Sequence, residues 1–183
     1  MISILRSVTI IVLTTVSISS FSQNIEVPIN YENPKRGYFK LEYEFGYEFN
    51  KDLPTIIVIS DAQQFYVRRG RIKKIQDDLF GQDFNVLDII PRSTNTDLKE
   101  KLNLVKDNKV NWEIAYSVFK SFQCVNDIEQ VINNVLKNNK DIYLYGQSGG
   151  AMLITEYLSV FPKTNVNKVF IGASVNPLIE NNL

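Results

Sequence analysis

A serine set among glycines is the group of residues in this sequence best suited to covalent chemistry. Residues 141–154 read DIYLYGQSGGAMLI, which is an apolar run, a GQSGG turn and a second apolar run with helical spacing. A strand, a sharp turn and a helix in this order are typical of a nucleophile elbow, in which the serine has a strained backbone conformation and the residues two positions away must be small. Gly146 and Gly150 meet that requirement, so Ser148 is predicted to be a nucleophile.

The helix expected after Ser148 adds a second chemical element. Its free backbone N–H groups and the positive end of its dipole point to the place where an oxyanion would form during acyl transfer. Gln147, directly before the serine, completes the elbow. The alternatives are an ordinary glycine-rich turn and a phosphate-binding loop, but the glycines are not followed by the Lys-Ser or Lys-Thr pair that such a loop needs.

The composition argues against several other classes of protein. The 183 residues include 20 basic and 20 acidic side chains, no histidine and a single cysteine. Without a cluster of His or Cys, no metal or cofactor site is predicted, and the scattered charges argue against nucleic-acid binding. The basic cluster in residues 68–74 is followed by Asp77 and Asp78 and is interpreted as a solvated helix face. Cys124 lies on an apolar helical face, where a small core residue is expected.

The first 22 residues have the pattern of a secretory signal peptide. Arg6 precedes an apolar stretch at residues 8–16, and Ser20-Phe-Ser22 forms a small-x-small cleavage site. A membrane anchor is the competing interpretation, but the apolar stretch is short and interrupted by polar residues. We therefore expect one domain, residues 23–183, that is secreted or periplasmic and has no stable membrane span once the leader is cleaved.

Apolar periodicity predicts the elements that position the elbow. Residues 25–29 form a short candidate strand, and residues 39–49 alternate apolar with polar positions, as in an antiparallel or edge strand with one packed face. Residues 55–60 are apolar throughout, which is typical of a strand covered on both faces. A helical pattern at 69–80 and a strand at 84–90 follow, so the order predicts a βαβ unit.

The second half of the chain continues the alternation. Residues 93–109 are polar, lack a clear period and are expected to form a surface excursion. Apolar residues at spacings of three and four then predict one long helix from residue 111 or 112 to 135. After the elbow strand, a helix to Phe161 and a strand at 168–172 complete the pattern. Together these elements predict an α/β fold with a mostly parallel sheet, flanked by helices and preceded by an antiparallel pair of strands.

Four of these segments together resemble the N-terminal part of an α/β-hydrolase. They are the opening VPINYENP at 27–34, the strand that follows it, the DIEQV segment at 127–131 and the elbow at 142–150. Within that superfamily the chain is similar to secreted proline iminopeptidases and tripeptidyl aminopeptidases. The resemblance covers essentially all of the mature chain and implies a serine hydrolase that cuts peptide or ester bonds through an acyl-serine intermediate.

The resemblance also implies roles for individual residues. Ser148 would be the nucleophile and the Gly149 amide one oxyanion donor, while the second donor would come from Asp61 or Ala62 in the loop after the third strand. The family usually has a Gly-Gly-Pro-Gly type loop there, whereas this sequence has Ser60-Asp-Ala-Gln-Gln. The implied substrate is a small molecule or a peptide, and no cofactor is expected.

The acid and the base of the family are not found in the sequence. In this fold they follow the serine in the chain order Ser, Asp or Glu, His, and no histidine is present. The sequence is therefore interpreted as the front portion of a longer hydrolase or as a natural truncation, inactive by itself. The alternative is a non-catalytic relative or remnant with a binding role or none.

No other residue is assigned as the base. Ser117 and Lys120 match an S-x-x-K pattern, but its companion motifs are absent and the pair is interpreted as part of an exposed helix face. Asp61 and Asp88 lie near the expected carboxyl ends of strands, where sites in open sheets gather. Either could contact substrate, and neither is assigned a role.

Overall fold

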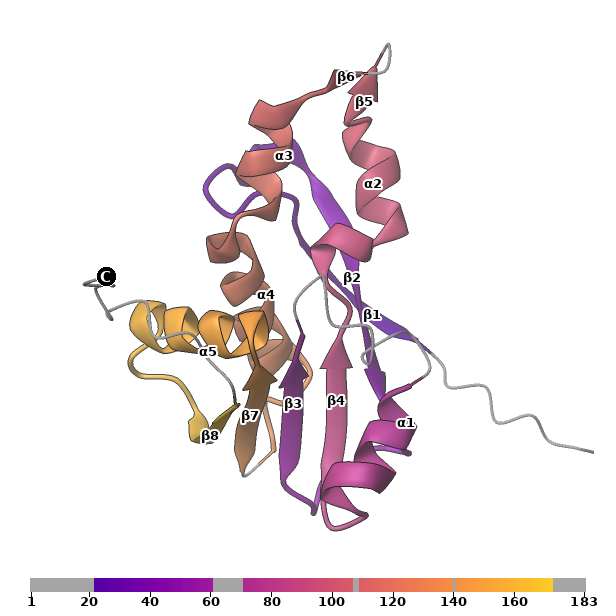
Figure 1. Ribbon diagram of the computed structural model, residues 1–183, viewed down its shortest axis with the longest axis vertical. Coiled ribbons are helices and arrows are strands. Elements are labelled where there is room, and N and C mark those ends of the chain that lie inside the picture. The colour runs from indigo at the N-terminus through magenta and orange to yellow at the C-terminus, as the bar shows by residue number, and fades with distance from the viewer. Residues whose placement is uncertain (1–21, 61–70, 107–108, 140, 173–183) are drawn as a thin grey trace, which may run out of the picture.

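In the described part of the chain, six strands form one mixed sheet at the centre of the protein (Figure 1). The computed structural model describes residues 22–60, 71–106, 109–139 and 141–172, so the expected signal peptide lies almost entirely outside it. The order is β1-β2-β4-β3-β7-β8; β2 is antiparallel to β1 and β4, and the other pairings are parallel. This confirms the predicted fold class. The strands are β1 (Gln23–Pro28), β2 (Tyr38–Phe45), β3 (Thr55–Ile59), β4 (Asn85–Ile89), β7 (Ile142–Gln147) and β8 (Val166–Gly172).

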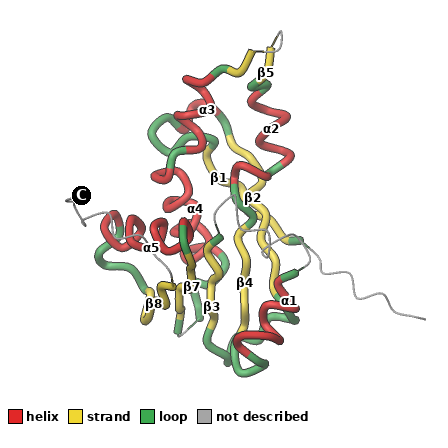
Figure 2. Tube along the Cα trace, in the orientation of Figure 1, coloured by secondary structure: helices red, strands yellow, loops and turns green. Residues whose placement is uncertain are grey.

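Helices cover both faces of the sheet (Figure 2). Consecutive residues of a strand point to opposite faces, so Ile57 packs in a cluster with residues of α4 and α5, while Val58 packs with Ile72 and Ile75 of α1. None of the helices in the described ranges has the length and apolarity of a membrane span. The helices on the two faces are α1 (Ile72–Ile75), continued by a π-helical turn (Gln76–Phe80), and α4 (Ser121–Asn134) with α5 (Gly149–Val160).

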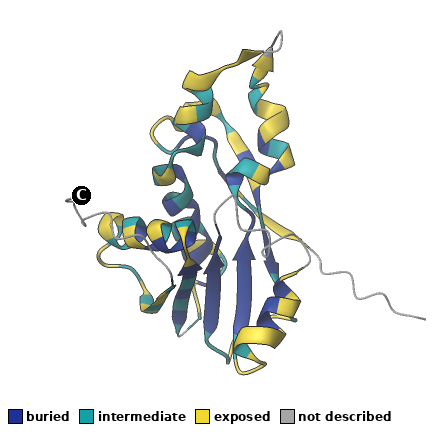
Figure 3. Ribbon diagram, viewed as in Figure 1, coloured by how far each residue is buried: buried dark blue, intermediate teal, exposed yellow. Residues whose placement is uncertain are grey.

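The central strands are apolar because they are covered on both sides. Every residue of β3 and β4 is buried, and Figure 3 shows these strands as a buried core beneath helices whose outer faces are exposed. In β2, Phe39, Leu41 and Tyr43 are buried whereas Lys40 is exposed, as the alternating pattern predicts. The strand ends at Phe45, four residues before the alternation does.

The excursion after β4, residues 93–109, contains regular structure that the sequence pattern did not predict. The Asn95 side chain accepts a hydrogen bond of 2.8 Å from the Leu98 backbone N–H and so caps α2. Leu98 is the buried residue of this helix, and one buried position gives no periodic signal. The segment consists of a 3-10 turn (Arg92–Thr94), α2 (Thr96–Leu102) and a short hairpin of β5 (Val105–Lys106) and β6 (Lys109–Val110); another 3-10 turn (Pro34–Arg36) joins β1 to β2.

The single long helix predicted for residues 111–135 is wrong, because two helices occupy this range. Helix α3 (Trp112–Phe119) ends at Lys120, which is extended (φ −62°, ψ 152°), and α4 begins at the next residue. The carbonyl of Val118 accepts a hydrogen bond of 3.1 Å from the guanidinium of Arg92. Carbonyls in the last turn of a helix lack intrahelical partners, and Arg92 satisfies this one at the point where the chain turns.

Arg92 is the centre of a buried network that joins four elements. It is 1% exposed, and all five of its N–H donors are used. Two contact the carboxylate of Asp127 on α4, of which the Nη2–Oδ1 distance is 2.9 Å. The other three bind the carbonyls of Ile29 (2.8 Å), Val118 (3.1 Å) and Pro28 (3.0 Å). The end of β1 and helices α3 and α4 are therefore all tied to the segment after β4.

Aromatic groups complete the surroundings of this ion pair. The Tyr31 hydroxyl donates to Asp127 at 2.8 Å, and the rings of Tyr31 and Phe39 lie 5.3 and 5.0 Å from the guanidinium carbon of Arg92. Burial opposes the charge of Arg92, but the hydrogen bonds and the negative charge of Asp127 outweigh it and raise the pKa of Arg92. Burial also raises the pKa of Asp127, and the hydrogen bonds and positive charge of Arg92 oppose that shift.

Replacing Arg92 with Leu should destabilise the protein strongly, because Asp127 and three carbonyls would be left buried without donors. Removing one partner of a buried ion pair costs about 3–5 kcal/mol, measurable as the free energy of unfolding in urea. The control is Lys74→Met, which breaks the exposed Lys74–Asp78 pair (side chains 74% and 54% exposed). That change should stay within about 1 kcal/mol. Equal effects of the two substitutions would contradict the structural role of Arg92.

Candidate functional site

Ser148 occupies the turn between β7 and α5 in a backbone conformation that L-residues rarely adopt. Its φ is +50° and its ψ is −122°. The strain is supported on both sides, because the Ser148 N–H donates to the Gly172 carbonyl at the end of β8 (3.1 Å) and its carbonyl accepts from Met152 in α5 (3.2 Å). The side chain makes no capping hydrogen bond to the helix, and the residue is exposed. Strained residues held in this way cluster at functional sites.

Two glycines allow the turn to form, as the sequence pattern predicts. A Cβ on Gly150 would overlap the carbonyl oxygen of Ile59 in β3, and a Cβ on Gly146 would lie 2.8 Å from both Gly150 and Ile154. Helix α5 therefore starts in direct contact with the carboxyl end of β3. A side chain at Gly150 would push α5 away from β3, and a side chain at Gly146 would push α5 away from β7.

This contact brings the start of α5 beside the segment after β3. The built Cβ position of Gly150 lies 3.7 Å from the Cα of Ser60, the residue that follows the strand. Gly149 is the first residue of α5, so its N–H has no acceptor within the helix. Asp61 and Ala62, predicted to give the second oxyanion donor, lie outside the described residues.

A pocket of about 400 Å³ opens beside the elbow. Its walls come from the segment after β4, the ends of α3 and α4 that face each other, and one side of α5. Gly149 and Ser60 both line it, so the pocket adjoins the proposed oxyanion position. The lining residues are Ser60, Pro91, Arg92, Ser93, Phe119, Ser121, Cys124, Gly149, Met152, Leu153 and Glu156.

Sequence periodicity did not identify most of these residues as part of a site. Met152, for example, is 49% exposed and lines the pocket. Gly149, Met152, Leu153 and Glu156 have the spacing i, i+3, i+4 and i+7, which places them on one face of α5. That spacing, counted from the residue after Ser148, was the signal that could have found them.

Cys124 also differs from its predicted role as a small core residue. It is partly buried on α4 and lines the pocket. Burial raises the pKa of its thiol to about 11, with a further contribution from the charge of Asp127. The thiol is therefore protonated at neutral pH and is not suited to act as a nucleophile there.

Asp88 is the penultimate residue of β4, near its carboxyl end as predicted, but its side chain is buried. It is 1% exposed and pairs in register with Val58 on one side and Glu44 on the other. Burial, and then the negative charge of Glu44, raise the pKa of Asp88 well above its usual range. Its Oδ1 has no hydrogen-bond partner within the described ranges, and the residue does not line the pocket beside the elbow.

The S-x-x-K pair was interpreted as part of an exposed helix face, but Ser117 and Lys120 are half-buried, Lys120 lies just beyond α3, and both have structural partners. The Ser117 hydroxyl donates to the Ile114 carbonyl (2.9 Å) and accepts from Arg36 (3.0 Å). The Lys120 ammonium forms an ion pair with Glu32. Among the residues described, no group of three or more His, Cys, Asp and Glu side chains could hold a metal ion.

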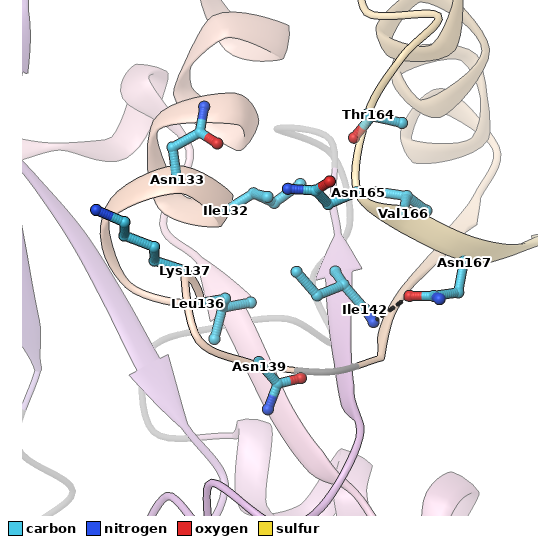
Figure 4. A pocket seen from close by; sticks show the side chains of 10 residues that line it. All are labelled: Ile132, Asn133, Leu136, Lys137, Asn139, Ile142, Thr164, Asn165, Val166 and Asn167. Atoms are coloured by element: carbon cyan, nitrogen blue, oxygen red, sulfur yellow. Dashed lines mark hydrogen bonds between the residues drawn. The ribbon is translucent and has the colours of Figure 1, made fainter.

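A second pocket of about 400 Å³ lies at the other end of β7 (Figure 4). It is lined by Ile142, where β7 begins, by the end of α4 with the residues after it, and by residues 164–167, which lead into β8. The Asn167 side chain, in β8, accepts a hydrogen bond of 2.8 Å from the Ile142 N–H. A six-residue strand separates it from Ser148 by roughly 17–20 Å at about 3.3 Å per residue. This pocket is therefore not part of the elbow site.

Comparison with solved structures identifies the fold. The chain is similar to a protein described as a novel epoxide hydrolase of the α/β-hydrolase superfamily from metagenomes of hot environments (TM-score 0.56, 12% identity, 86% of this chain, 44% of that chain). It is also similar to homoserine O-acetyltransferase from Staphylococcus aureus (TM-score 0.54, 16% identity, 85% of this chain, 47% of that chain). No family model and no curated protein matches the sequence.

The chain therefore has the α/β-hydrolase fold, and it spans a little under half the length of these two proteins. At identities of 12% and 16% the similarity concerns the fold alone. The arrangement of the site must accordingly be argued from its own residues.

Replacing Gly150 with Ala should destabilise the protein by about 3 kcal/mol, because the added Cβ would overlap the Ile59 carbonyl and overpacking typically costs 1–3 kcal/mol. Ser159→Ala, at an exposed position of the same helix, is the control and should change the free energy of unfolding by less than about 0.5 kcal/mol. Urea unfolding measures both, and equal effects of the two substitutions would contradict the close contact at Gly150.

The reactivity of Cys124 should increase with pH over an unusually wide range. Because only the thiolate reacts and the pKa is raised to about 11, the rate of iodoacetamide alkylation should rise about tenfold per pH unit from pH 7 to 9.5 without levelling off. The same protein unfolded in urea is the control and should level off near pH 8.5 to 9. A plateau below pH 9 in the folded protein would show that the thiol is not buried as described.

Proposed function

We propose that this chain carries the nucleophile of a serine hydrolase that cuts ester or peptide bonds. The Ser148 oxygen attacks the carbonyl carbon, a new C–O bond forms, and the bond to the leaving group breaks to give an acyl-serine intermediate that water later hydrolyses. The observation that carries the proposal is the positive φ of Ser148 between β7 and α5, on an exposed residue whose side chain does not cap the helix.

The start of α5 supports this chemistry electrostatically. The N–H of Gly149 has no helical acceptor, and the helix N-terminus carries about half a positive charge. Negative charge that develops on the substrate oxygen would therefore be stabilised next to Ser148. Removal of one such donor typically lowers the rate by about 10² to 10³, so we assign the Gly149 amide as one half of the oxyanion hole.

The proton of Ser148 needs an acceptor, and the 183 residues contain no histidine. We propose that the base is supplied by groups beyond these residues and that the chain alone does not turn over substrate. The lack of histidine equally favours a second candidate, a non-catalytic relative that binds a ligand at the elbow. The two candidates differ in whether Ser148 can be acylated once a base is added.

The proposed substrate class is based on the sequence resemblance, because the fold alone does not determine it. The structural neighbours include a protein described as an epoxide hydrolase and another described as an acetyltransferase, so the fold admits different reactions. The choice of a peptide or ester follows the sequence resemblance to secreted aminopeptidases. We propose export from the cytoplasm on the same basis, because residues 1–22 have the pattern of a signal peptide.

Labelling with a fluorophosphonate tests the nucleophile. A missing general base lowers the rate by about 10² to 10⁴, so we expect slow formation of one adduct, located on Ser148 by peptide mass spectrometry. Added imidazole, an external base, should accelerate it in proportion to its concentration. Ser148→Ala should give no adduct with or without imidazole.

Ser159→Ala is the matched control, because Ser159 is an exposed serine on the same helix. It should label like the unmodified chain. Absence of an adduct on Ser148 at high imidazole would remove the hydrolase proposal in favour of the non-catalytic candidate.

A further inference from the structure

The pocket beside the elbow has walls that are mostly apolar. Phe119 at the end of α3 and Met152 and Leu153 on α5 line it together with Cys124. Its volume of about 400 Å³ is in the range of small-molecule sites. Gly149, the residue after Ser148, is also part of the lining, so the pocket reaches the start of α5.

Two charged side chains reach the pocket, and one of them is already neutralised. Arg92 has all five N–H donors committed to Asp127 and to three backbone carbonyls, so it has no donor left for a ligand. Its positive charge is balanced by Asp127 at hydrogen-bond distance. Arg92 therefore contributes no net charge that would attract an anion into the pocket.

The remaining charge is the carboxylate of Glu156. It lies on the same face of α5 as Gly149 and Met152 and is positioned by a hydrogen bond of 2.9 Å from the Ser121 hydroxyl at the start of α4. Among the residues that the structure describes, no lysine or arginine other than Arg92 lines the pocket. The described walls thus present apolar groups, serine hydroxyls and the negative charge of Glu156.

We infer that this pocket receives the acyl part of the substrate and selects acyl groups that are apolar and carry no negative charge, with Glu156 as the residue that excludes carboxylates. That the bound group is the acyl part of a substrate rests on the proposed function of Ser148, whereas the preference for apolar, uncharged groups follows from the pocket alone. Apolar burial favours the chain of the ligand, about fourfold in affinity for each methylene. A ligand carboxylate would be repelled at short range by the carboxylate of Glu156.

Hexanamide and hexanoate test the preference, because they have the same chain and differ in the charge of the head group. Cys124 is the single cysteine of the chain and lines the pocket, so its modification by methyl methanethiosulfonate at pH 9 reports occupancy. We expect hexanamide to slow the modification in a saturable manner. Hexanoate should require at least a tenfold higher concentration, and both results should be the same in Ser148→Ala.

Glu156→Gln isolates the charge without changing the shape of the side chain. In this variant we expect the difference between hexanoate and hexanamide to fall to about threefold or less. Glu113→Gln is the matched control, because Glu113 is an exposed carboxylate on α3 that does not line the pocket. This variant should keep the full tenfold difference.

Three results would overturn the inference. They are no protection by hexanamide up to its solubility limit, equal protection by hexanoate in the unmodified chain, or an unchanged difference in Glu156→Gln. Protection by hexanamide without any adduct on Ser148 under imidazole would instead place the failure with the nucleophile, because occupancy of the pocket is measured without chemistry at the serine.

Discussion

The hydrogen bonds of one buried guanidinium, that of Arg92, are the interactions on which this structure depends. Arg92 follows β4 and binds the end of β1, the last turn of α3 and the carboxylate of Asp127 on α4. Through these contacts the excursion that contains α2 and α3 is fixed to the side of the sheet that α4 covers. The same contacts place Phe119, next to Val118, at the wall of the pocket beside the elbow.

The second constraint is the close approach of α5 to β3. Gly150 lies directly against the Ile59 carbonyl. The turn that joins β7 to α5 is correspondingly sharp, and Ser148 within it has a positive φ. Backbone strain of this kind costs about 1–3 kcal/mol and persists only when the surroundings fix it. Here a hydrogen bond to Gly172 in β8 and the first turn of α5 fix it from opposite sides. The exposed hydroxyl is thus a consequence of packing between two buried elements.

Features that depend on local sequence pattern could be predicted from the sequence, whereas features that depend on contacts between distant residues could not. Both-face burial makes β3 apolar throughout, and the steric demand of the elbow requires Gly146 and Gly150, so these features could be predicted. The break at Lys120 could not, because the apolar spacing continues through it and the bond of Val118 to Arg92, 26 residues away, leaves no local signal. The pocket was missed for the same reason, since its walls come from three helices and the segment after β4.

The neutralisation of Arg92 also limits how the site could stabilise an oxyanion. An arginine beside the nucleophile would ordinarily be a strong electrophilic group, because its fork of donors can bind developing negative charge. In this protein every donor is used within the fold, and Asp127 cancels the charge. Stabilisation of an oxyanion by the described residues therefore falls to backbone amides, above all that of Gly149, and to the dipole of α5. The guanidinium of Arg92 therefore has a structural role, because the donors that could bind an oxyanion are used within the fold.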